Sequence, residues 1–189
     1  MLIGITGGIA SGKTYVCNYL KSKNYAIFEA DYEIAKLAKK SEVIAQIRAE
    51  FPELGLGAIK KEVLREICLS DNSRLCALQK IYYPFLEIEL NKFFINHEND
   101  EISFLEAPLL FEAGYNKFVT KIITIIADIN IKEQRALNRG VSKKDFERFL
   151  KIQMSDHEKL KKTDYIIYSN NEINNVEMQI ENLINSLKK

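Results

Sequence analysis

The segment from Gly7 to Thr14 constrains this chain more than any other. It reads Gly-Gly-Ile-Ala-Ser-Gly-Lys-Thr and matches the pattern G-x-x-x-x-G-K-[ST]. An apolar run of strand character, residues 2–6, precedes it, and residues 15–20 after it suit a helix. Fewer than about one chain in a hundred of this length would match the pattern by chance. An ordinary glycine turn before a helix is therefore the weaker interpretation, and we predict a nucleotide-binding phosphate loop.

The predicted loop offers several kinds of group to a phosphate. Its glycines permit backbone angles that side chains forbid, so successive N–H groups can point at phosphate oxygens. The following helix adds the positive end of its dipole. Lys13 would reach the β and γ phosphates of ATP, and the Thr14 hydroxyl would ligate Mg²⁺. The predicted nucleotide contacts are Gly8, Ile9, Ala10, Ser11, Gly12, Lys13, Thr14 and Tyr15.

The composition is that of an ordinary globular protein. The chain has 189 residues, of which 47% are hydrophobic and 28% are charged, and its formal net charge is +1. The length predicts one domain with a sizeable core. The balanced charge gives no reason to expect a nucleic-acid partner. We expect a monomer or a weak homo-oligomer.

Cysteine usage and hydropathy predict a cytoplasmic protein. The three cysteines include no C-x-x-C pair, and their odd number favours free thiols in a reducing compartment. The chain begins directly with the predicted loop, so we expect no signal peptide. The most apolar stretch, Ile122–Ile131, contains Asp128 and is too short to span a bilayer. No membrane partner is expected.

Strand-like and helical segments alternate along the chain. Strands are expected at residues 2–6, 25–28, 102–106, 122–127 and 165–168, and an amphipathic helix at residues 173–187. This alternation predicts an α/β fold with a mainly five-stranded parallel sheet between helices, the three-layer sandwich of P-loop NTPases. Within a single domain of residues 1–189, we expect a helical, substrate-binding insertion at residues 32–98 and a helical lid at residues 129–161.

Several residues predict where helices begin and end. Asp71 or Ser73 would cap a long helical stretch, and Pro84 within that stretch should kink or split it. Ser142 would cap a helix that runs to about Lys161.

Asp31 directly follows the second predicted strand. Ligands of parallel α/β sheets gather at the carboxyl ends of the strands, so this carboxylate is a candidate for chemistry. It would orient an acceptor hydroxyl and take its proton during phosphoryl transfer. The alternative is a helix N-cap, because Asp is favoured there and a helix begins at once. The two roles are compatible.

Two glutamates follow the third predicted strand. Glu106 ends the strand and could hold Mg²⁺ directly or through water, although a surface ion pair is an equal alternative. Glu112 follows Leu109-Leu110-Phe111. It could position a loop near the substrate, and a solvated loop residue is the other interpretation.

Arg135 and Arg139 lie four residues apart and therefore share one helix face. Gly140 beside them offers a hinge. One interpretation is that the two arginines only form a solvated basic face. We favour a mobile lid whose guanidinium groups clamp nucleotide phosphates and neutralise charge in the transition state.

Three classes of protein use such a phosphate loop. A switch GTPase, which is a non-enzymatic nucleotide switch read by partners, would usually carry an N-K-x-D signature, and the stretch beginning Asn116-Lys117 fails at Val119. A motor or nucleic-acid ATPase would usually be larger. The small size, the helical insertion and the two arginines favour a small-molecule kinase, for which a nucleoside monophosphate kinase is one possibility.

Four patches in this order resemble the dephospho-CoA kinase family. They are residues 6–14, Ala30-Asp31, Pro108-Leu109-Leu110-Phe111-Glu112, and Arg135 with Arg139. The first patch opens many kinases, whereas the Pro-Leu-Leu-Phe-Glu patch is more particular to this family. Gln153-Met154, Lys159 and Thr163-Asp164 resemble later landmarks of the family.

The resemblance implies an ATP-dependent kinase that phosphorylates the ribose 3′-hydroxyl of dephospho-CoA in the last step of CoA synthesis. It implies that Asp31 is the base, that Lys13 and Thr14 belong to the ATP and Mg²⁺ site, and that Arg139 is a lid arginine. The helical insertion would bind the CoA moiety. The catalytic residues would be Asp31, Lys13 and Arg139.

The chain departs from the family pattern at three places. Glu29-Ala30-Asp31 stands where Asp-Ala-Asp is usual, and Tyr83-Pro84 where His-Pro is frequent. Residues 167–171 replace an Ile-Asp-Asn-x-Gly turn, so adenine contacts of that turn cannot be carried over by side chain. None of these departures removes the residues of the phosphoryl-transfer core.

Overall fold

The structure, a computed structural model, describes residues 1–170 and 172–188. Its strands form one five-stranded sheet in the order β2-β3-β1-β4-β5. The strands are β1 (Leu2–Thr6), β2 (Ala26–Glu29), β3 (Ser103–Glu106), β4 (Lys121–Ile126) and β5 (Tyr165–Tyr168). β1 pairs in parallel with β3 and β4, and β4 pairs in parallel with β5. All five predicted strands are present, with boundaries shifted by about one residue.

The central strand β1 is buried along its whole length. Two buried faces explain why its sequence is almost continuously apolar and does not alternate with polar residues. Gly4 is the one residue of β1 that has no side chain. A Cβ on Gly4 would lie 3.0 Å from Leu110 Cδ2, so the segment after β3 packs closely against β1 at this point.

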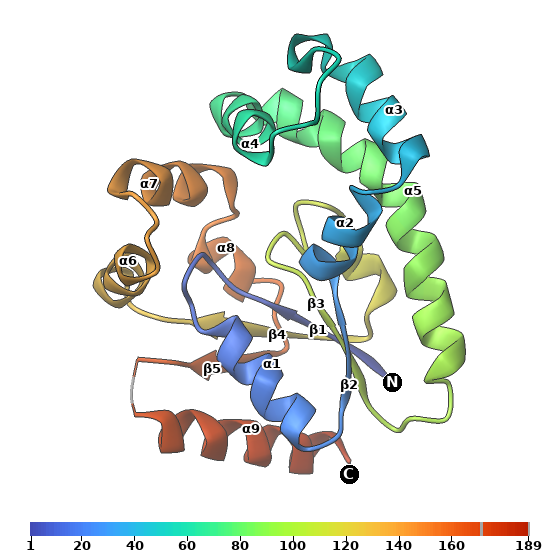
Figure 1. The fold of residues 1–189 in the computed structure, drawn as a ribbon. Coiled ribbons are helices and arrows are strands. Elements are labelled where there is room, and N and C mark those ends of the chain that lie inside the picture. The colour runs from blue at the N-terminus through green and yellow to red at the C-terminus, as the bar shows by residue number, and fades with distance from the viewer. Residues whose placement is uncertain (171, 189) are drawn as a thin grey trace. The chain divides into compact units, whose positions relative to one another are not determined.

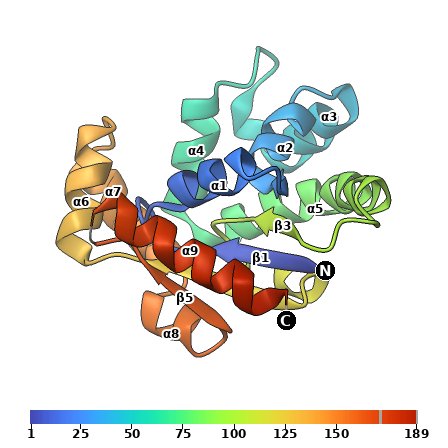
Figure 2. The same cartoon turned by 90° about the horizontal axis from the view of Figure 1, so that it is seen from below.

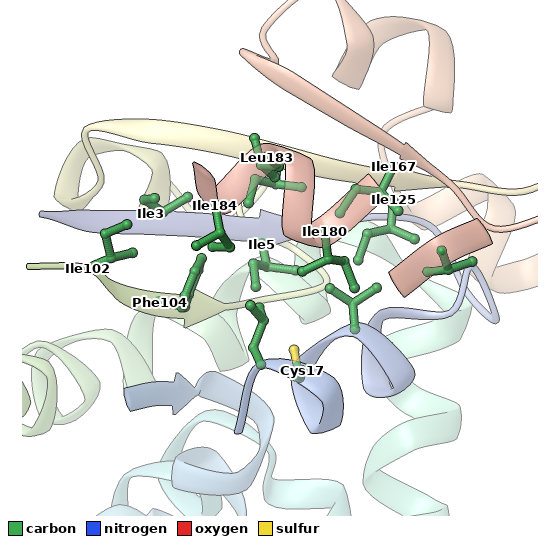
Figure 3. Close-up of a cluster of buried hydrophobic side chains, with 14 residues drawn as sticks. Ile3, Ile5, Cys17, Ile102, Phe104, Ile125, Ile167, Ile180, Leu183 and Ile184 are labelled. Atoms are coloured by element: carbon green, nitrogen blue, oxygen red, sulfur yellow. The ribbon is translucent and has the colours of Figure 1, made fainter. Parts of the chain in front are cut away.

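Helices α1 (Lys13–Ser22) and α9 (Ile173–Leu187) cover one face of the sheet (Figure 2). Figure 3 shows Ile5 of β1 beside Ile180 of α9 and Phe104 of β3 beside Ile184 of α9, and Cys17 of α1 belongs to the same buried cluster. Two tyrosines on α1 join the helices further, because the hydroxyls of Tyr15 and Tyr19 donate hydrogen bonds to glutamates of α9.

The other face of the sheet is covered by the segment after β3 and by α8 (Asp156–Leu160). Thr6 at the end of β1 donates a hydrogen bond to the carbonyl of Pro108 at 3.3 Å. Thr124 of β4 shares a hydrogen bond with Thr163, just after α8. The sheet therefore lies between two layers, and the predicted α/β three-layer sandwich is confirmed.

Helices α6 (Ile129–Asn138), α7 (Lys143–Ile152) and α8 follow β4. Ser142 caps α7 as predicted, since its Oγ accepts a hydrogen bond from Asp145 N at 3.1 Å. The predicted continuous helix to about Lys161 is wrong. Residues 153–155 break it, and Ser155 starts α8 with a capping box that it forms with Glu158. The S-x-x-E pattern at Ser155 therefore begins a new helix inside the segment that was expected to be continuous.

Residues 29–98 form a compact unit of their own by backbone contacts. It contains α2 (Ala30–Leu37), α3 (Ser41–Glu50), α4 (Lys61–Ser70) and α5 (Asn72–Asn96), together with a short 3₁₀ helix (Figure 1). The other three α-helices each pack against α5. Asp71 caps α5, as its Oδ1 accepts a hydrogen bond from Ser73 N at 2.8 Å. Pro84 was expected to kink or split this helix, and the split does not occur, because the helix continues through Pro84.

Within the described parts of the chain, no helix combines the length and the apolar character needed to cross a membrane.

Candidate active site

The phosphate loop connects β1 to α1, and two of its glycines are required by the backbone. Gly7 has φ +153°, and a Cβ there would lie 2.5 Å from the carbonyl oxygen of Ile125. Gly12 caps α1 with φ +99°, in the left-handed region. Ala10, with φ +57°, also lies in that region although it carries a side chain. The tip of the loop is thus a strained turn that its surroundings must hold.

Hydrogen bonds close this turn around the Lys13 ammonium. Ser11 N donates to the carbonyl of Gly8 at 3.2 Å. Lys13 Nζ donates to the carbonyl oxygens of Gly7 and Gly8, at 2.8 and 3.0 Å. The positive charge therefore sits in the loop, beside the N-terminus of α1. Backbone N–H groups, a helix N-terminus and a lysine together make an anion site.

Thr14 and Glu106 are the predicted Mg²⁺ ligands. Thr14 is exposed on the first turn of α1. Glu106 pairs with Ile5 in the register of β1 and β3, which places it at the edge of the sheet that carries the loop. No cluster of three His, Cys, Asp or Glu side chains that could hold a metal occurs among the described residues. Mg²⁺ prefers few protein ligands together with phosphate oxygens and water, so a hydroxyl and a carboxylate fit a metal that arrives with a nucleotide.

The two predicted lid arginines lie on α6 but differ in their surroundings. Arg135 donates from Nη1 to Ser169 Oγ at 3.0 Å and from Nη2 to the Ser169 carbonyl at 2.6 Å. Ser169 Oγ in turn donates to the Ser11 carbonyl at 2.6 Å. Arg135 therefore ties the end of β5 to the phosphate loop. Arg139 is the exposed C-cap residue of α6.

A cavity of about 170 Å³ opens between α1, α6 and the start of α9. It is lined by Gly12, Tyr15, Arg135, Arg139, Ser169, Ile173 and Val176. The cavity thus brings together four of the predicted nucleotide contacts. Asn171, the last residue of the turn that departs from the family pattern, lies outside the described residues.

Three side chains from later in the chain reach the tip of the loop. Ile9 N donates a hydrogen bond to Gln153 Oε1 at 2.8 Å. Lys132 on α6 forms an ion pair with Asp156 at 2.5 Å, and both side chains lie against Gly8. Lys132 stands three residues before Arg135 and so shares its helix face, which is the one sequence signal that pointed to it.

Glu112 is not a solvated loop residue. Its Oε1 accepts a hydrogen bond from Met154 N at 2.6 Å and lies 3.3 Å from Lys159 Nζ. Lys159 is fully buried and also donates to the Pro108 carbonyl at 2.9 Å. Burial lowers the pKa of Lys159, and the neighbouring Glu112 carboxylate opposes that shift. Glu112 therefore positions the segment between α7 and α8.

Asp31 lies in the first turn of α2 and is exposed. The N-cap of this helix is Glu29, two residues earlier. Asp31 is therefore not the N-cap of α2, which was the alternative interpretation of this residue. It belongs to the separate unit of residues 29–98.

A parallel sheet whose central strand ends in a phosphate loop defines the class of P-loop kinases and their relatives. The chain shares this fold with a shikimate kinase from Acinetobacter baumannii, with a TM-score of 0.61 at 15% identity, over 99% of this chain and 94% of that one. The sequence matches the dephospho-CoA kinase family over residues 1–175, and the chain belongs to that family.

Individual relatives agree with this assignment. The dephospho-CoA kinase of Fusobacterium nucleatum subsp. nucleatum is 32% identical over 185 residues, which cover 96% of this chain and 95% of the relative. The crystal structure of TT1252 from Thermus thermophilus has a TM-score of 0.86 at 27% identity, over 99% of this chain and 97% of that one.

Proposed function

We propose that this protein transfers the γ-phosphoryl group of ATP to the ribose 3′-hydroxyl of dephospho-CoA, giving CoA and ADP. The observation that carries this function is the match to the dephospho-CoA kinase family over residues 1–175, which includes the complete phosphate loop. Kinase chemistry consists mainly of positioning and charge stabilisation, and the loop offers groups for both.

ATP would lie with its phosphates on the loop and its nucleoside in the neighbouring cavity. Lys13 and the N–H groups at the start of α1 would bind the β and γ phosphates. The cavity reaches Gly12 at one end and combines apolar Val176 with the guanidinium of Arg139. Arg139 would contact the bound nucleotide from there and neutralise charge that develops during transfer.

Thr14 and Glu106 would hold Mg²⁺, which when bound neutralises phosphate charge. Asp31 would accept the proton of the 3′-hydroxyl. The hydroxyl oxygen then forms a bond to the γ-phosphorus while the bond from that phosphorus to the bridging oxygen breaks, and ADP leaves with the electron pair. Residues 29–98 would bind the CoA part of the acceptor, which is the role that the family assigns to a helical insertion.

We place the protein in the cytoplasm. Its three cysteines are free thiols, and two of them, Cys17 and Cys68, are buried. Free thiols are typical of reducing compartments. Burial raises the pKa of the Cys68 thiol to about 11, so this cysteine is protonated and unreactive at neutral pH.

A direct assay tests the function. The purified protein would be incubated with ATP, Mg²⁺ and one acceptor at a time: dephospho-CoA, AMP, CMP or shikimate. We expect CoA and ADP in equal amounts from dephospho-CoA, detected by mass spectrometry, and none from a Lys13→Ala control. Turnover of a nucleoside monophosphate without any turnover of dephospho-CoA would show that dephospho-CoA is not the acceptor.

A further inference from the structure

The tip of the phosphate loop is held by a side chain that lies 144 residues further along the chain. Gln153 Oε1 accepts the hydrogen bond from Ile9 N at 2.8 Å. Ile9 precedes Ala10, the residue with φ +57°. A strained conformation of this kind persists only where neighbouring contacts hold it, and the Gln153 amide supplies such a contact at the tip.

The backbone around Gln153 is itself fixed by three consecutive hydrogen bonds. Gln153 N donates to the carbonyl of Phe149 at the end of α7. Met154 N donates to Glu112, and Ser155 N donates to Glu158 within the capping box of α8. The break between α7 and α8 is thus an ordered connection that projects the Gln153 side chain to the loop.

These contacts join into a continuous path that returns to the loop. Starting at Thr6, which precedes the loop, the path runs through the Pro108 carbonyl to buried Lys159 and on to Glu112. Glu112 accepts a hydrogen bond from Met154 N, and the adjacent Gln153 accepts one from Ile9 N. The Lys159–Glu112 pair is shielded from water, so the interaction is strong and poorly replaced by solvent.

A second contact flanks the same tip. Asp156 Oδ1 and Lys132 Nζ would each lie 3.3 Å from a Cβ on Gly8, which is tighter than most Cβ contacts, so both side chains pack closely against the loop. Lys132 is almost fully buried, and its charge is balanced by Asp156. Figure 1 shows α8 beside the loop that leads into α1, as these contacts require.

We infer that Gln153 is a positioning residue for ATP binding: by accepting the Ile9 N–H, it holds the phosphate loop in the conformation that receives the nucleotide. The inference rests on the proposed function to the extent that ATP is the ligand of this loop. Gln153 is not a catalytic residue, because it acts on the nucleotide through the loop backbone.

The opposite role for Gln153 would be competition with the nucleotide for the phosphate loop. If its amide oxygen occupied a site that a phosphate oxygen needs, its removal would strengthen ATP binding. If it positions the loop, its removal weakens ATP binding, because the loop must then be ordered by the ligand. The sign of the change in ATP affinity therefore decides between the two roles.

The test compares three full-length variants with the wild type. Gln153→Met keeps most of the side-chain volume and removes the acceptor, whereas Gln153→Glu keeps an acceptor for Ile9 N. Asp164→Ala is the matched control. Asp164 also accepts a hydrogen bond from a backbone N–H, that of Ile122 at 2.9 Å, but at the start of β4, away from the loop.

The first measurement is calorimetric titration with ATP and Mg²⁺ in the absence of any acceptor. We expect Gln153→Met to raise the Kd of ATP about three- to tenfold, the range that corresponds to one neutral hydrogen bond. Asp164→Ala should lower the melting temperature without changing this Kd. An unchanged or lower Kd for Gln153→Met would overturn the inference.

The second measurement is hydrogen exchange of the Ile9 amide in the unliganded protein. Exchange should be about fivefold faster in Gln153→Met and close to the wild-type rate in Gln153→Glu. Equal exchange in Gln153→Met and the wild type would also overturn the inference. Neither measurement needs the acceptor, so a wrong assignment of dephospho-CoA leaves this test intact.

Discussion

Asp31 presents a carboxylate in the first turn of α2, directly after the buried residue Ala30. If it is the base, Asp31→Asn should lower kcat by about 10²-fold or more, because the amide cannot take the proton of the acceptor. The Kd of ATP should not change. Steady-state kinetics and calorimetric titration measure the two quantities separately.

Glu33 supplies the matched control for Asp31. It lies on the same helix and forms an ion pair with Lys36 at 2.8 Å. Glu33→Gln should leave kcat within about twofold of the wild type, since a surface ion pair contributes little. An Asp31→Asn variant with the kcat of the Glu33→Gln variant would remove Asp31 from the reaction.

The pKa of Tyr15 predicts that the stability of the fold depends on pH. Its hydrogen bond to Glu177, together with partial burial, raises the pKa of Tyr15 from 10.0 to about 12. The folded protein therefore keeps this proton over a pH range in which the unfolded chain has lost it. The stabilisation is fully present below pH 10 and is lost as the pH rises through about 12.

Urea denaturation of the wild type and Tyr15→Phe at several pH values measures this effect. The difference in free energy of unfolding between the two proteins should be constant up to about pH 9 and should shrink between pH 10 and 12. Tyr32→Phe, at an exposed tyrosine of α2, corrects for effects of alkali on the whole chain. A constant difference up to pH 12 would contradict the assigned hydrogen bond.

At the scale of elements, the two arginines at the end of α6 have different surroundings. Arg135 makes two hydrogen bonds to Ser169, next to β5, whereas Arg139 is the exposed C-cap residue. Arg139→Ala should lower kcat/KM by about 10- to 100-fold, as expected when one charged contact in a transition state is removed. Its melting temperature should stay close to that of the wild type.

Arg135→Ala should differ by losing stability as well as activity. Two hydrogen bonds from a charged group, partly exposed here, are together worth about 2 kcal/mol. Thermal unfolding followed by circular dichroism measures this loss, and activity is compared per folded molecule. If Arg139→Ala keeps full activity per folded molecule, the interpretation of Arg139 as a solvated, non-functional residue is correct.

Two elements differ from the local expectation. The sequence predicts one helix from Ser142 to about Lys161, but the S-x-x-E pattern at Ser155 starts a new helix inside it. The reverse occurs at Pro84. Packing of three helices against α5 maintains a helix that the local rule for proline would interrupt.

At the scale of the whole molecule, ATP should stabilise the fold by mass action. ATP at 100 times its Kd adds about 2.7 kcal/mol, which corresponds to a rise in melting temperature of roughly 5–10 °C for a chain of this size. Asp31→Asn should keep this rise and Lys13→Ala should lose most of it. Differential scanning fluorimetry with ATP and Mg²⁺ measures both, and an equal rise in both variants would place the nucleotide elsewhere than on the loop.

The sequence by itself determined the phosphate loop, the five strands, the cap at Ser142 and the kinase family, and it narrowed the cap of α5 to Asp71 or Ser73. These features depend on residues that lie close together in the chain, where spacing and backbone preference decide the outcome. Even the family assignment rests on short patches whose order along the chain is enough to identify them.

Only the tertiary structure decided which distant side chains meet at the loop. Gln153 reaches Ile9 across 144 residues, and Arg135 reaches Ser169 across 34. In the sequence, Lys159 is notable only because it resembles a family landmark, whereas in the structure it is fully buried beside Glu112. Such pairs depend on strand order, on register and on where α7 ends. No local preference encodes them, because they form only when the layers of the sandwich close.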